Sequence, residues 1–477
     1  MGIFPIDIDL FRKYPKKFEK EFEKRFLDKK VLERARELDK KWREKIKQVN
    51  KLRHEINKRS KAIAIIKAFL EKKIKKEEAK EKIRKILERD VEINKKTIEK
   101  IKKEVGEIEK KLKVIENETE NIRRELYNIL LTFPQFSLDK IPIGPDERYN
   151  KPIRFWGKPK VWRNYLDQFK EQIDGFDVKY EVIEVKPKHH YDIIKEYDLA
   201  DTELAGKMAG ARFYIEKNEL VFLDFALTLY ALEFYKKKGF DYVIVPPYLM
   251  KRDVEERITH ITTFEDAIYT TREDDLILIP TSEHPICAMF IDRVFLEREL
   301  PLRILAWSPA FRREAGAHGK DTKGIFRTHQ FHKVELHSVT TLDQDLEELE
   351  YMLKIFEEFN RTLNIPYRVI ILSSGDMDKR ARIQYDLEAW FPGQGKYREL
   401  GSLATMGDWV SRKINTRVER KGKTEFVANL YATGCAIQRT WCAILENNWD
   451  PKKNIIKIPK PLWRYTGIKK LYPKASS

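Results

Sequence analysis

A stretch without proline, from Lys16 to Phe133, limits most strongly what this chain can fold into. It holds a single glycine, Gly106, and is dominated by Lys, Glu, Arg and Ile. Mostly apolar residues recur every seven positions in its second half. One row is Ile101, Ile108, Ile115, Ile122 and Ile129, and the other is Ile98, Val105, Leu112, Thr119 and Leu126. A seven-residue period predicts a long helix that packs along one seam.

The first half of this stretch repeats the pattern. Its rows are Trp42, Val49, Ile56 and Ile63, with Leu38 and Leu52 in the second row. A Lys-rich segment around residues 72–80 separates the halves, so we expect an antiparallel hairpin. An arm of roughly forty residues would be about 60 Å long, at about 1.5 Å per residue.

Heptad helices commonly serve as dimerising or purely structural coiled coils. Basic residues outside the seam favour a nucleic-acid arm instead: Lys40, Lys41, Arg43, Lys45, Lys47, Lys51, Arg53, Lys58, Arg59 and Lys61. The surface has no interleaved aromatic residues for base stacking. It would therefore contact backbone shape and phosphate rather than bases.

The composition changes after Pro134. Turn residues lead into helical patterns such as 223–238, which alternate with apolar runs at 242–245, 277–279 and 367–372. This alternation predicts an α+β domain. We therefore expect two domains, a helical coiled-coil arm over residues 1–134 and an α+β domain over 135–477.

The bulk composition narrows the class of protein. A net charge of +18 favours a polyanionic partner whose binding weakens with salt, although lysine can also simply keep a surface soluble. Three cysteines without Cys-x-x-Cys spacing argue against a disulfide framework and against structural zinc. We find no signal segment and no apolar run long enough for a bilayer, so we expect a cytoplasmic protein without membrane contact.

One segment, residues 307–335, carries the strongest indication of function. Two strands joined by a loop of glycines and cations would place Arg312, Glu314, Phe331 and Glu335 on one surface. These groups suit a phosphate, an amino-purine edge, a base face and an ammonium group, respectively. The segment predicts a site for a nucleotide and an amino acid.

Three further segments carry polar groups suited to such a site. Residues 280–283 offer small hydroxyls and Glu283, and could equally cap the helix that follows. Glu399 and Ser402 supply hard oxygens of the kind that Mg²⁺ prefers. Arg439 opens an apolar helical run, where a buried charge calls for a phosphate. Neither common phosphate-binding loop is present.

Taken in order, these motifs resemble those of seryl-tRNA synthetases, which are class II aminoacyl-tRNA synthetases. The resemblance covers nearly the whole chain: the coiled-coil arm, 281–283, 311–316 with 319–324, 329–335, 399–402 and Arg439. It implies an antiparallel β-sheet flanked by helices, and a homodimer interface at residues 239–247. The implied activity is ATP-dependent ligation of serine to tRNA(Ser), held by the arm. Use of tRNA(Sec) is left open.

The resemblance also assigns roles to single residues. The catalytic residues would be Arg312, Glu335 and Arg439, and Mg²⁺ would bind with ATP at Glu399 and Ser402. ATP would contact Arg312, Arg313, Glu314, Phe331, Glu399, Leu400, Gly401, Ser402 and Arg439. L-Serine would contact Thr281, Glu283, Arg312, Glu335 and Thr433, with Thr433 as the candidate partner of the serine hydroxyl.

The chain departs from the family pattern at a few positions. Tyr431 stands where many relatives have Asn, Gln438 replaces a small residue, and Lys320 and Lys323 replace arginines. Two alternatives follow. A non-catalytic tRNA-binding paralogue would have lost residues such as Arg312 or Arg439, and none is replaced. Activation of another small amino acid has only Tyr431 in its favour.

Overall fold

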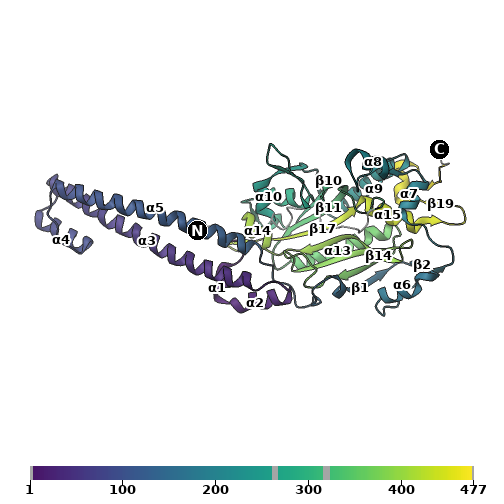
Figure 1. The fold of residues 1–477 in the computed structure, drawn as a ribbon, viewed down its shortest axis with the longest axis horizontal. Coiled ribbons are helices and arrows are strands. Elements are labelled where there is room, and N and C mark those ends of the chain that lie inside the picture. The colour runs from purple at the N-terminus through teal and green to yellow at the C-terminus, as the bar shows by residue number, and fades with distance from the viewer. Residues whose placement is uncertain (1–3, 260–266, 315–322, 475–477) are drawn as a thin grey trace. The chain divides into compact units, whose positions relative to one another are not determined.

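The structure is a computed structural model that describes residues 4–259, 267–314 and 323–474 (Figure 1). The 315–322 part of the strand-loop-strand motif, which includes Lys320, lies outside the described residues. The chain divides into two compact units. One is residues 28–132, here called the arm, and the other is residues 4–27 with 133–474, here called the sheet unit.

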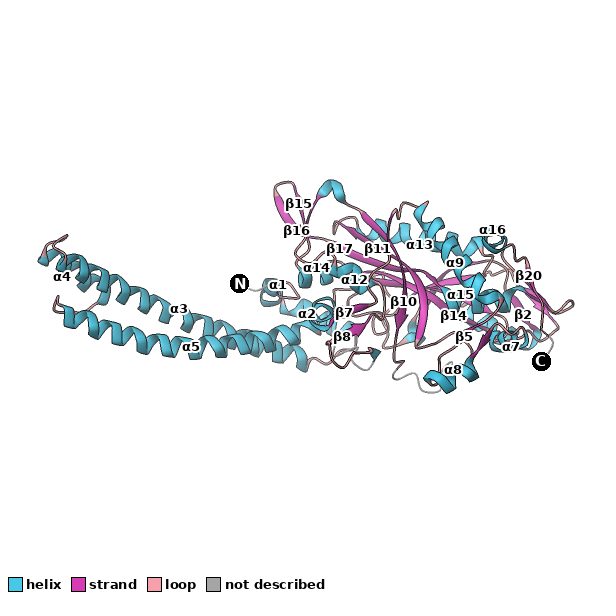
Figure 2. Ribbon diagram, turned by 90° about the horizontal axis from the view of Figure 1, so that it is seen from above, coloured by secondary structure: helices cyan, strands magenta, loops and turns pink. Residues whose placement is uncertain are grey.

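The arm is built on two long helices, α3 (Lys30–Leu70) and α5 (Lys95–Leu131), which lie side by side (Figures 1 and 2). Both predicted heptad rows of α5 are buried or half-buried, as are the rows of α3. Thr119, the one polar member of the α5 rows, donates its hydroxyl to the carbonyl of Ile115 at 2.6 Å. The predicted coiled-coil hairpin is confirmed.

The connection between the two long helices contains a helix of its own. Residues 76–87 form α4 (Lys76–Leu87), where we expected only a Lys-rich separator. Ala79 and Ile83 of α4 are buried, and Ile83 packs in a cluster with Ala62 and Ile66 of α3. A short apolar stripe among the lysines is therefore enough to order this segment against the end of the hairpin.

The start of the chain does not belong to the arm. Helices α1 (Ile8–Lys13) and α2 (Pro15–Lys24) lie in the sheet unit, so the predicted arm boundary at residue 1 differs from the structural division. Phe18 and Phe22 are buried against Phe133. Arg25 donates to the carbonyl oxygens of Ala381 at 2.6 Å and Gln135 at 2.9 Å. Aromatic packing replaces the heptad seam here.

An eight-stranded sheet forms the centre of the sheet unit. Its order is β1 (Lys151–Trp156), β12 (Tyr367–Ile371), β13 (Ile383–Phe391), β14 (Lys396–Thr405), β17 (Ala428–Ala436), β11 (Gln330–Thr340), β10 (Leu302–Phe311) and β6 (Tyr242–Ile244). All neighbours are antiparallel except β10 and β6.

Helices α9 (Glu219–Lys236), α13 (Asp345–Thr362) and α15 (Ile437–Asn448) contact this sheet and share its main apolar core. The expected α+β fold, an antiparallel sheet flanked by helices, is confirmed. No helix in the described part of the chain combines the length and apolarity needed to cross a membrane.

Shorter elements complete the sheet unit. The helices are α6 (Leu166–Gln172), α7 (His190–Glu196), α8 (Thr202–Ala209), α10 (Arg252–Ile258), α12 (Glu283–Ala288), α14 (Trp409–Ile414) and α16 (Trp463–Thr466). The strands are β2 (Lys160–Trp162), β3 (Glu181–Ile183), β4 (Ala200–Asp201), β5 (Ile215–Glu216), β7 (Leu249–Lys251), β8 (Leu276–Leu278), β9 (Val294–Leu296), β15 (Arg417–Arg420), β16 (Lys423–Phe426), β18 (Trp449–Asp450), β19 (Ile455–Lys457) and β20 (Lys470–Leu471).

Candidate functional site

A polar cavity of about 450 Å³ lies on the central strands of the sheet. Most of the residues selected from the sequence line it: Thr281, Glu283, Arg312, Glu314, Phe331, Glu335, Glu399, Leu400, Ser402, Thr433 and Arg439. They come from β11, β14, β17, α12 and α15, and from the loops before α12 and after β10. Segments up to about 160 positions apart in the sequence thus meet in one site.

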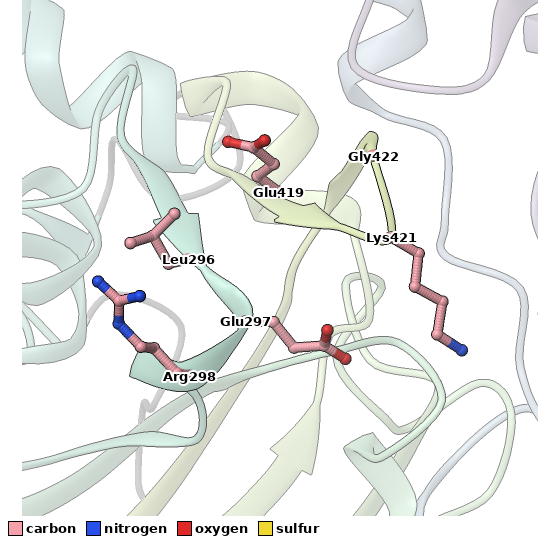
Figure 3. A pocket seen from close by; sticks show the side chains of 6 residues that line it. All are labelled: Leu296, Glu297, Arg298, Glu419, Lys421 and Gly422. Carbon is pink, nitrogen blue, oxygen red and sulfur yellow. The ribbon is translucent and has the colours of Figure 1, made fainter.

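A second hollow, of about 500 Å³, lies at β9 and the β15–β16 hairpin (Figure 3). Leu296, Glu297, Arg298, Glu419, Lys421 and Gly422 line it. It contains none of the residues selected from the sequence and opens widely to solvent. We therefore take the polar cavity as the candidate functional site.

Strand pairing places Glu335 directly opposite Thr433. The register between β11 and β17 shifts at Val334 and Glu335, and Glu335 then pairs with Thr433. Gly401 of β14 lies behind Thr433, where a Cβ atom would come within 2.4 Å of the Thr433 Cβ. Gly401 is not among the cavity-lining residues, and its lack of a side chain leaves room for the Thr433 side chain.

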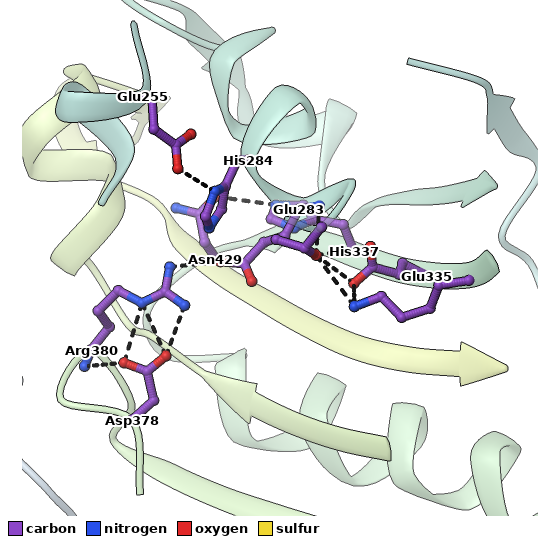
Figure 4. A network of polar contacts seen from close by, with 10 residues as sticks. Glu255, Glu283, His284, Glu335, His337, Asp378, Arg380 and Asn429 are labelled. Atoms are coloured by element: carbon purple, nitrogen blue, oxygen red, sulfur yellow. Dashed lines mark hydrogen bonds and ion pairs between the residues drawn. The ribbon is translucent and has the colours of Figure 1, made fainter. Parts of the chain in front are cut away.

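Glu335 is the most densely contacted carboxylate of the cavity (Figure 4). It accepts hydrogen bonds from the Thr281 hydroxyl at 2.7 Å and from the Ser282 backbone N–H at 2.6 Å. The Lys333 ammonium lies 2.5 Å from it. Burial alone would raise the pKa of Glu335, but the charge of Lys333 and these hydrogen bonds lower it. The carboxylate is therefore held ionised and ready for a cation.

Cations gather at the other side of the cavity. Arg312 follows β10, donates from Nε to the Pro280 carbonyl at 3.1 Å and lies 5.4 Å from the centre of the Phe331 ring. Burial and the neighbouring Arg439 lower the pKa of the Arg312 guanidinium, while Glu314 and other acidic groups oppose that shift. Two guanidinium groups close enough to repel each other favour an anion between them.

Glu399 and Arg439 form an ion pair at 3.1 Å. Ser402, three positions after Glu399, donates its hydroxyl to Asp386 of β13 at 2.5 Å. Burial and the charge of Glu399 raise the pKa of Asp386 well above its usual range. Sequence reasoning missed Asp386, which follows Tyr385 in a strand and pairs with Ser402 in the register. Its alternation with buried residues on β13 was the only available signal.

These oxygens fit a magnesium ion. Glu399, Ser402 and Asp386 offer hard ligands, and two half-buried carboxylates that repel each other call for a cation. Two other groups in the described ranges have ligand atoms close enough for a metal. They are Glu216 with Asp224 and His332, and His189 with His190 and Glu446.

Three selected residues make contacts that the sequence did not indicate. Glu314 forms an ion pair with Arg327. Gln438 accepts from the His332 backbone N–H at 2.8 Å and donates to Glu216 at 3.0 Å, which accounts for an amide at this position. Arg313 does not line the cavity, and its backbone N–H donates to the Ala267 carbonyl at 2.8 Å.

Family models match both parts of the chain. Residues 6–97 match the seryl-tRNA synthetase N-terminal domain, and residues 263–448 match the tRNA synthetase class II core domain (G, H, P, S and T). A serine–tRNA ligase of Korarchaeum cryptofilum is 42% identical over 468 residues, which are 98% of this chain and 96% of that protein. The serine–tRNA ligase of Pyrococcus furiosus is 42% identical over 472 residues, 98% of each chain.

Solved structures agree with these matches. The seryl-tRNA synthetase of Pyrococcus horikoshii, crystallised with ATP, superposes with a TM-score of 0.86 at 38% identity, covering 98% of this chain and 100% of that one. A cytoplasmic serine–tRNA ligase of Naegleria fowleri, crystallised with AMP, gives a TM-score of 0.77 at 30% identity over 98% of this chain and 99% of that one. The chain therefore belongs to the seryl-tRNA synthetase family of class II aminoacyl-tRNA synthetases.

Proposed function

We propose that this chain activates L-serine with ATP and transfers the seryl group to the 3′ end of tRNA(Ser). The observation that carries this proposal is the composition of one cavity. Guanidinium groups and an aromatic ring line one side, and a buried carboxylate surrounded by hydroxyls lines the other. Family membership over 98% of the chain supports the same reaction.

Arg312 is the central residue of the proposed activation step. It would hold the α-phosphate of ATP together with the serine carboxylate, which attacks that phosphorus in line. Arg439 would bind the γ-phosphate, Phe331 would stack on the adenine, and Glu314 would accept from its amino group. Positioned cations stabilise the charge that develops in the transition state, so no general base is required. The terminal ribose hydroxyl of the tRNA then takes the seryl group.

Glu335 would receive the serine ammonium group. In the structure the Lys333 ammonium lies on this carboxylate, so we expect the substrate to replace that contact or to share it. Thr281, Glu283 and Thr433 would complete the pocket, with Thr433 facing the serine hydroxyl. A pocket that pairs with a hydroxyl strongly rejects amino acids lacking it, because its polar groups would then stay unpaired.

Mg²⁺ bound with ATP at Glu399 and Ser402 would neutralise phosphate charge. Asp386 belongs to the same proposed ligand environment, because it accepts the Ser402 hydroxyl and repels Glu399. These side chains also orient one another, since the Ser402 hydroxyl lies between the two carboxylates, 2.5 Å from Asp386 and 3.5 Å from Glu399.

The arm would bind tRNA(Ser) through its phosphates. Lys40, Lys41, Lys47, Lys51 and Lys61 are exposed on α3. Other cations pair with glutamates of α5, such as Lys45 with Glu118 at 2.5 Å and Arg53 with Glu116 at 2.7 Å. Because the seam residues face inward, the exposed lysines can bind an anionic surface.

We also propose a cytoplasmic location, because the proposed reaction uses tRNA and ATP.

A homodimer is proposed at the β6 edge of the sheet. Among the described residues, strand β6 pairs with β10 and with no other strand, and Tyr242, Val243 and Val245 are exposed there. Phe222 and Phe225 of α9 are each 64% exposed. An open strand edge with large apolar side chains is a surface that proteins usually cover. Light scattering should give twice the chain mass, and Val245→Glu should shift it towards the monomer.

Pyrophosphate exchange into ATP tests the proposed reaction directly. The assay is run with each of the twenty amino acids in turn, with Mg²⁺ present. Serine should support exchange far above alanine, glycine and threonine. Exchange with another small amino acid would redirect the proposal to that substrate. Binding of tRNA without any exchange would favour a non-catalytic paralogue.

A further inference from the structure

Asp378 and Arg380 line the cavity although the motifs selected from the sequence do not include them. They lie in the loop between β12 and β13, beside Glu283 (Figure 4). Tyr431 of β17 also lines the cavity. A carboxylate, a guanidinium and a phenol thus line a wall of the cavity that lies outside the motifs selected from the sequence.

Arg380 is held in one orientation. Its Nε and Nη2 donate to Oδ2 of Asp378 at 3.0 and 2.7 Å, and its backbone N–H donates to Oδ1 at 2.8 Å. Nη1 donates to Oε1 of Glu283 at 2.8 Å. Arg380 is 7% exposed and Glu283 5%. Because Asp378 occupies one side of the planar fork, Nη1 is directed at Glu283.

The loop that carries this pair is itself anchored. Arg25 of the N-terminal segment donates to the backbone carbonyl of Asp378 at 3.0 Å and to that of Ala381 at 2.6 Å. Burying a carboxylate such as that of Glu283 is costly unless a cation and fixed hydrogen bonds accompany it. Arg380 supplies both from a loop whose backbone cannot easily shift.

Tyr431 connects this pair to the Thr433 side of the pocket. Both residues lie on β17, two positions apart, so they share one face of the strand. The Arg380 guanidinium lies 6.0 Å from the centre of the Tyr431 ring. Arg380 therefore contacts two neighbouring walls, the carboxylate of Glu283 and the face of a phenol.

The strand register places this wall at one end of the cavity. Tyr431 pairs with Ala404, Thr433 packs on Gly401, and Arg439 contacts Glu399. Moving along β17 towards α15 thus leads from Tyr431 past Thr433 to the guanidinium proposed to bind phosphate. Arg380 lies at the end remote from that guanidinium, which is the amino-acid end.

We propose that Arg380 is a positioning residue for amino-acid selection: held by Asp378, it fixes Glu283 and supports Tyr431, so that the pocket fits a small hydroxylated amino acid. This inference rests on the proposed activation of serine. The inference predicts different effects on the two substrates, because Arg380 would affect the binding of the amino acid and not that of ATP.

The test measures serine and ATP KM in pyrophosphate exchange for Arg380→Gln, Arg380→Lys, Asp378→Asn and Glu283→Gln. Arg380→Gln should raise the serine KM about tenfold or more, lower the preference for serine over alanine by a similar factor, and leave the ATP KM within about twofold. Arg380→Lys should recover only part of the loss, because it lacks the fork. Adding Arg380→Gln to Glu283→Gln should change the serine KM by less than about twofold.

Arg382→Gln is the matched control. Arg382 lies two positions away, binds Asp345 at 2.5 Å and does not line the cavity, so its serine KM should stay unchanged. An equal rise in both KM values, or additive effects in the double variant, would overturn the inference. If Arg380→Gln fails to fold by circular dichroism, Arg380→Lys and Asp378→Asn decide. If the unaltered chain shows serine-dependent exchange and the variants keep its serine KM, this inference alone is refuted. If the unaltered chain shows no serine-dependent exchange, the proposed function is refuted as well.

Discussion

The arm and the sheet unit both use ion pairs, but they place them differently. In the arm, the Lys45 and Glu118 side chains of one pair are 30% and 49% exposed. In the sheet unit, Arg380 and Glu283 are 8% and 6% exposed at the side chain. Exposed pairs are screened by salt and contribute little to stability, whereas buried pairs fix geometry and are costly to break. The charges of this arm pair are therefore open to solvent, whereas those of the Arg380–Glu283 pair fix side chains around the cavity.

The largest expected effect is a loss of serine activation, without a loss of tRNA binding, on a change in the sheet unit. Arg312→Ala should lower serine-dependent exchange by about a thousandfold or more, because it removes the guanidinium proposed to hold the α-phosphate. tRNA binding, measured by filter retention, should remain within about twofold. Arg298→Ala, at an exposed arginine outside the candidate site, is the control. Retained exchange in Arg312→Ala would remove this residue from the proposed mechanism.

A shortened arm should impair the charging of tRNA and spare pyrophosphate exchange. Arg53 and Glu116 lie opposite each other on α3 and α5, since their side chains pair at 2.7 Å. Residues 54–115 can therefore be replaced by a short Gly-Ser linker that keeps the lower hairpin. We expect charging of tRNA(Ser) to fall about a hundredfold, while exchange stays within about twofold. Unimpaired charging would assign the arm another purpose.

Breaking one pair in each unit should give unequal losses of stability. Glu348 is 5% exposed and accepts two hydrogen bonds from Arg303, at 2.8 and 2.7 Å. Glu348→Ala should lower the free energy of unfolding by about 3 kcal/mol, because it leaves a guanidinium without its counter-charge. Glu118→Ala in the arm should cost less than about 1 kcal/mol. Urea unfolding measures both, and equal losses would contradict the comparison.

A smaller effect should appear in how the free energy of unfolding of the sheet unit depends on pH. Burial and the charge of Asp224 raise the pKa of Glu216 from 4.5 to about 7. Folding then favours protonated Glu216, so its contribution to stability is complete below about pH 4.5 and is lost as the pH rises through 7. Glu216→Gln should remove on the order of 2 kcal/mol of the decline between pH 5 and 8. Urea unfolding at both pH values tests this, with the exposed Glu203→Gln as control. A decline that persists in Glu216→Gln would assign it to other groups.

Much of the arm could be predicted because its information is local. Ile101 and Ile108 lie on one helix face whatever surrounds them, since the helical period alone determines that face. Helix α4 was missed because lysines outnumber its buried residues, Ala79 and Ile83, and only their contact with α3 makes them significant. The N-terminal helices, which we placed in the arm, pack against Phe133 in the sheet unit, a contact that proximity along the chain does not reveal.

The site was predictable only in part for the same reason. Motif order selected Arg312, Glu335, Glu399, Thr433 and Arg439, and one cavity contains all five. Asp378 and Arg380 carried no recognisable pattern, and Asp386 carried only its alternation with buried residues on β13. Their importance arises from a strand pairing with Ser402 and from a loop that reaches Glu283. Gly401, which we predict to contact ATP, also leaves room for the Thr433 side chain.

The sequence by itself determined the periodic helices of the arm, the mixed α+β character of the remainder and the motifs that mark the family. These features depend on chemistry within a few neighbouring residues. Only the tertiary structure decided which carboxylate faces which cation and which side chains meet in one cavity. Those pairings join residues about a hundred positions apart, such as Glu283 and Arg380, and burial gives them their strength.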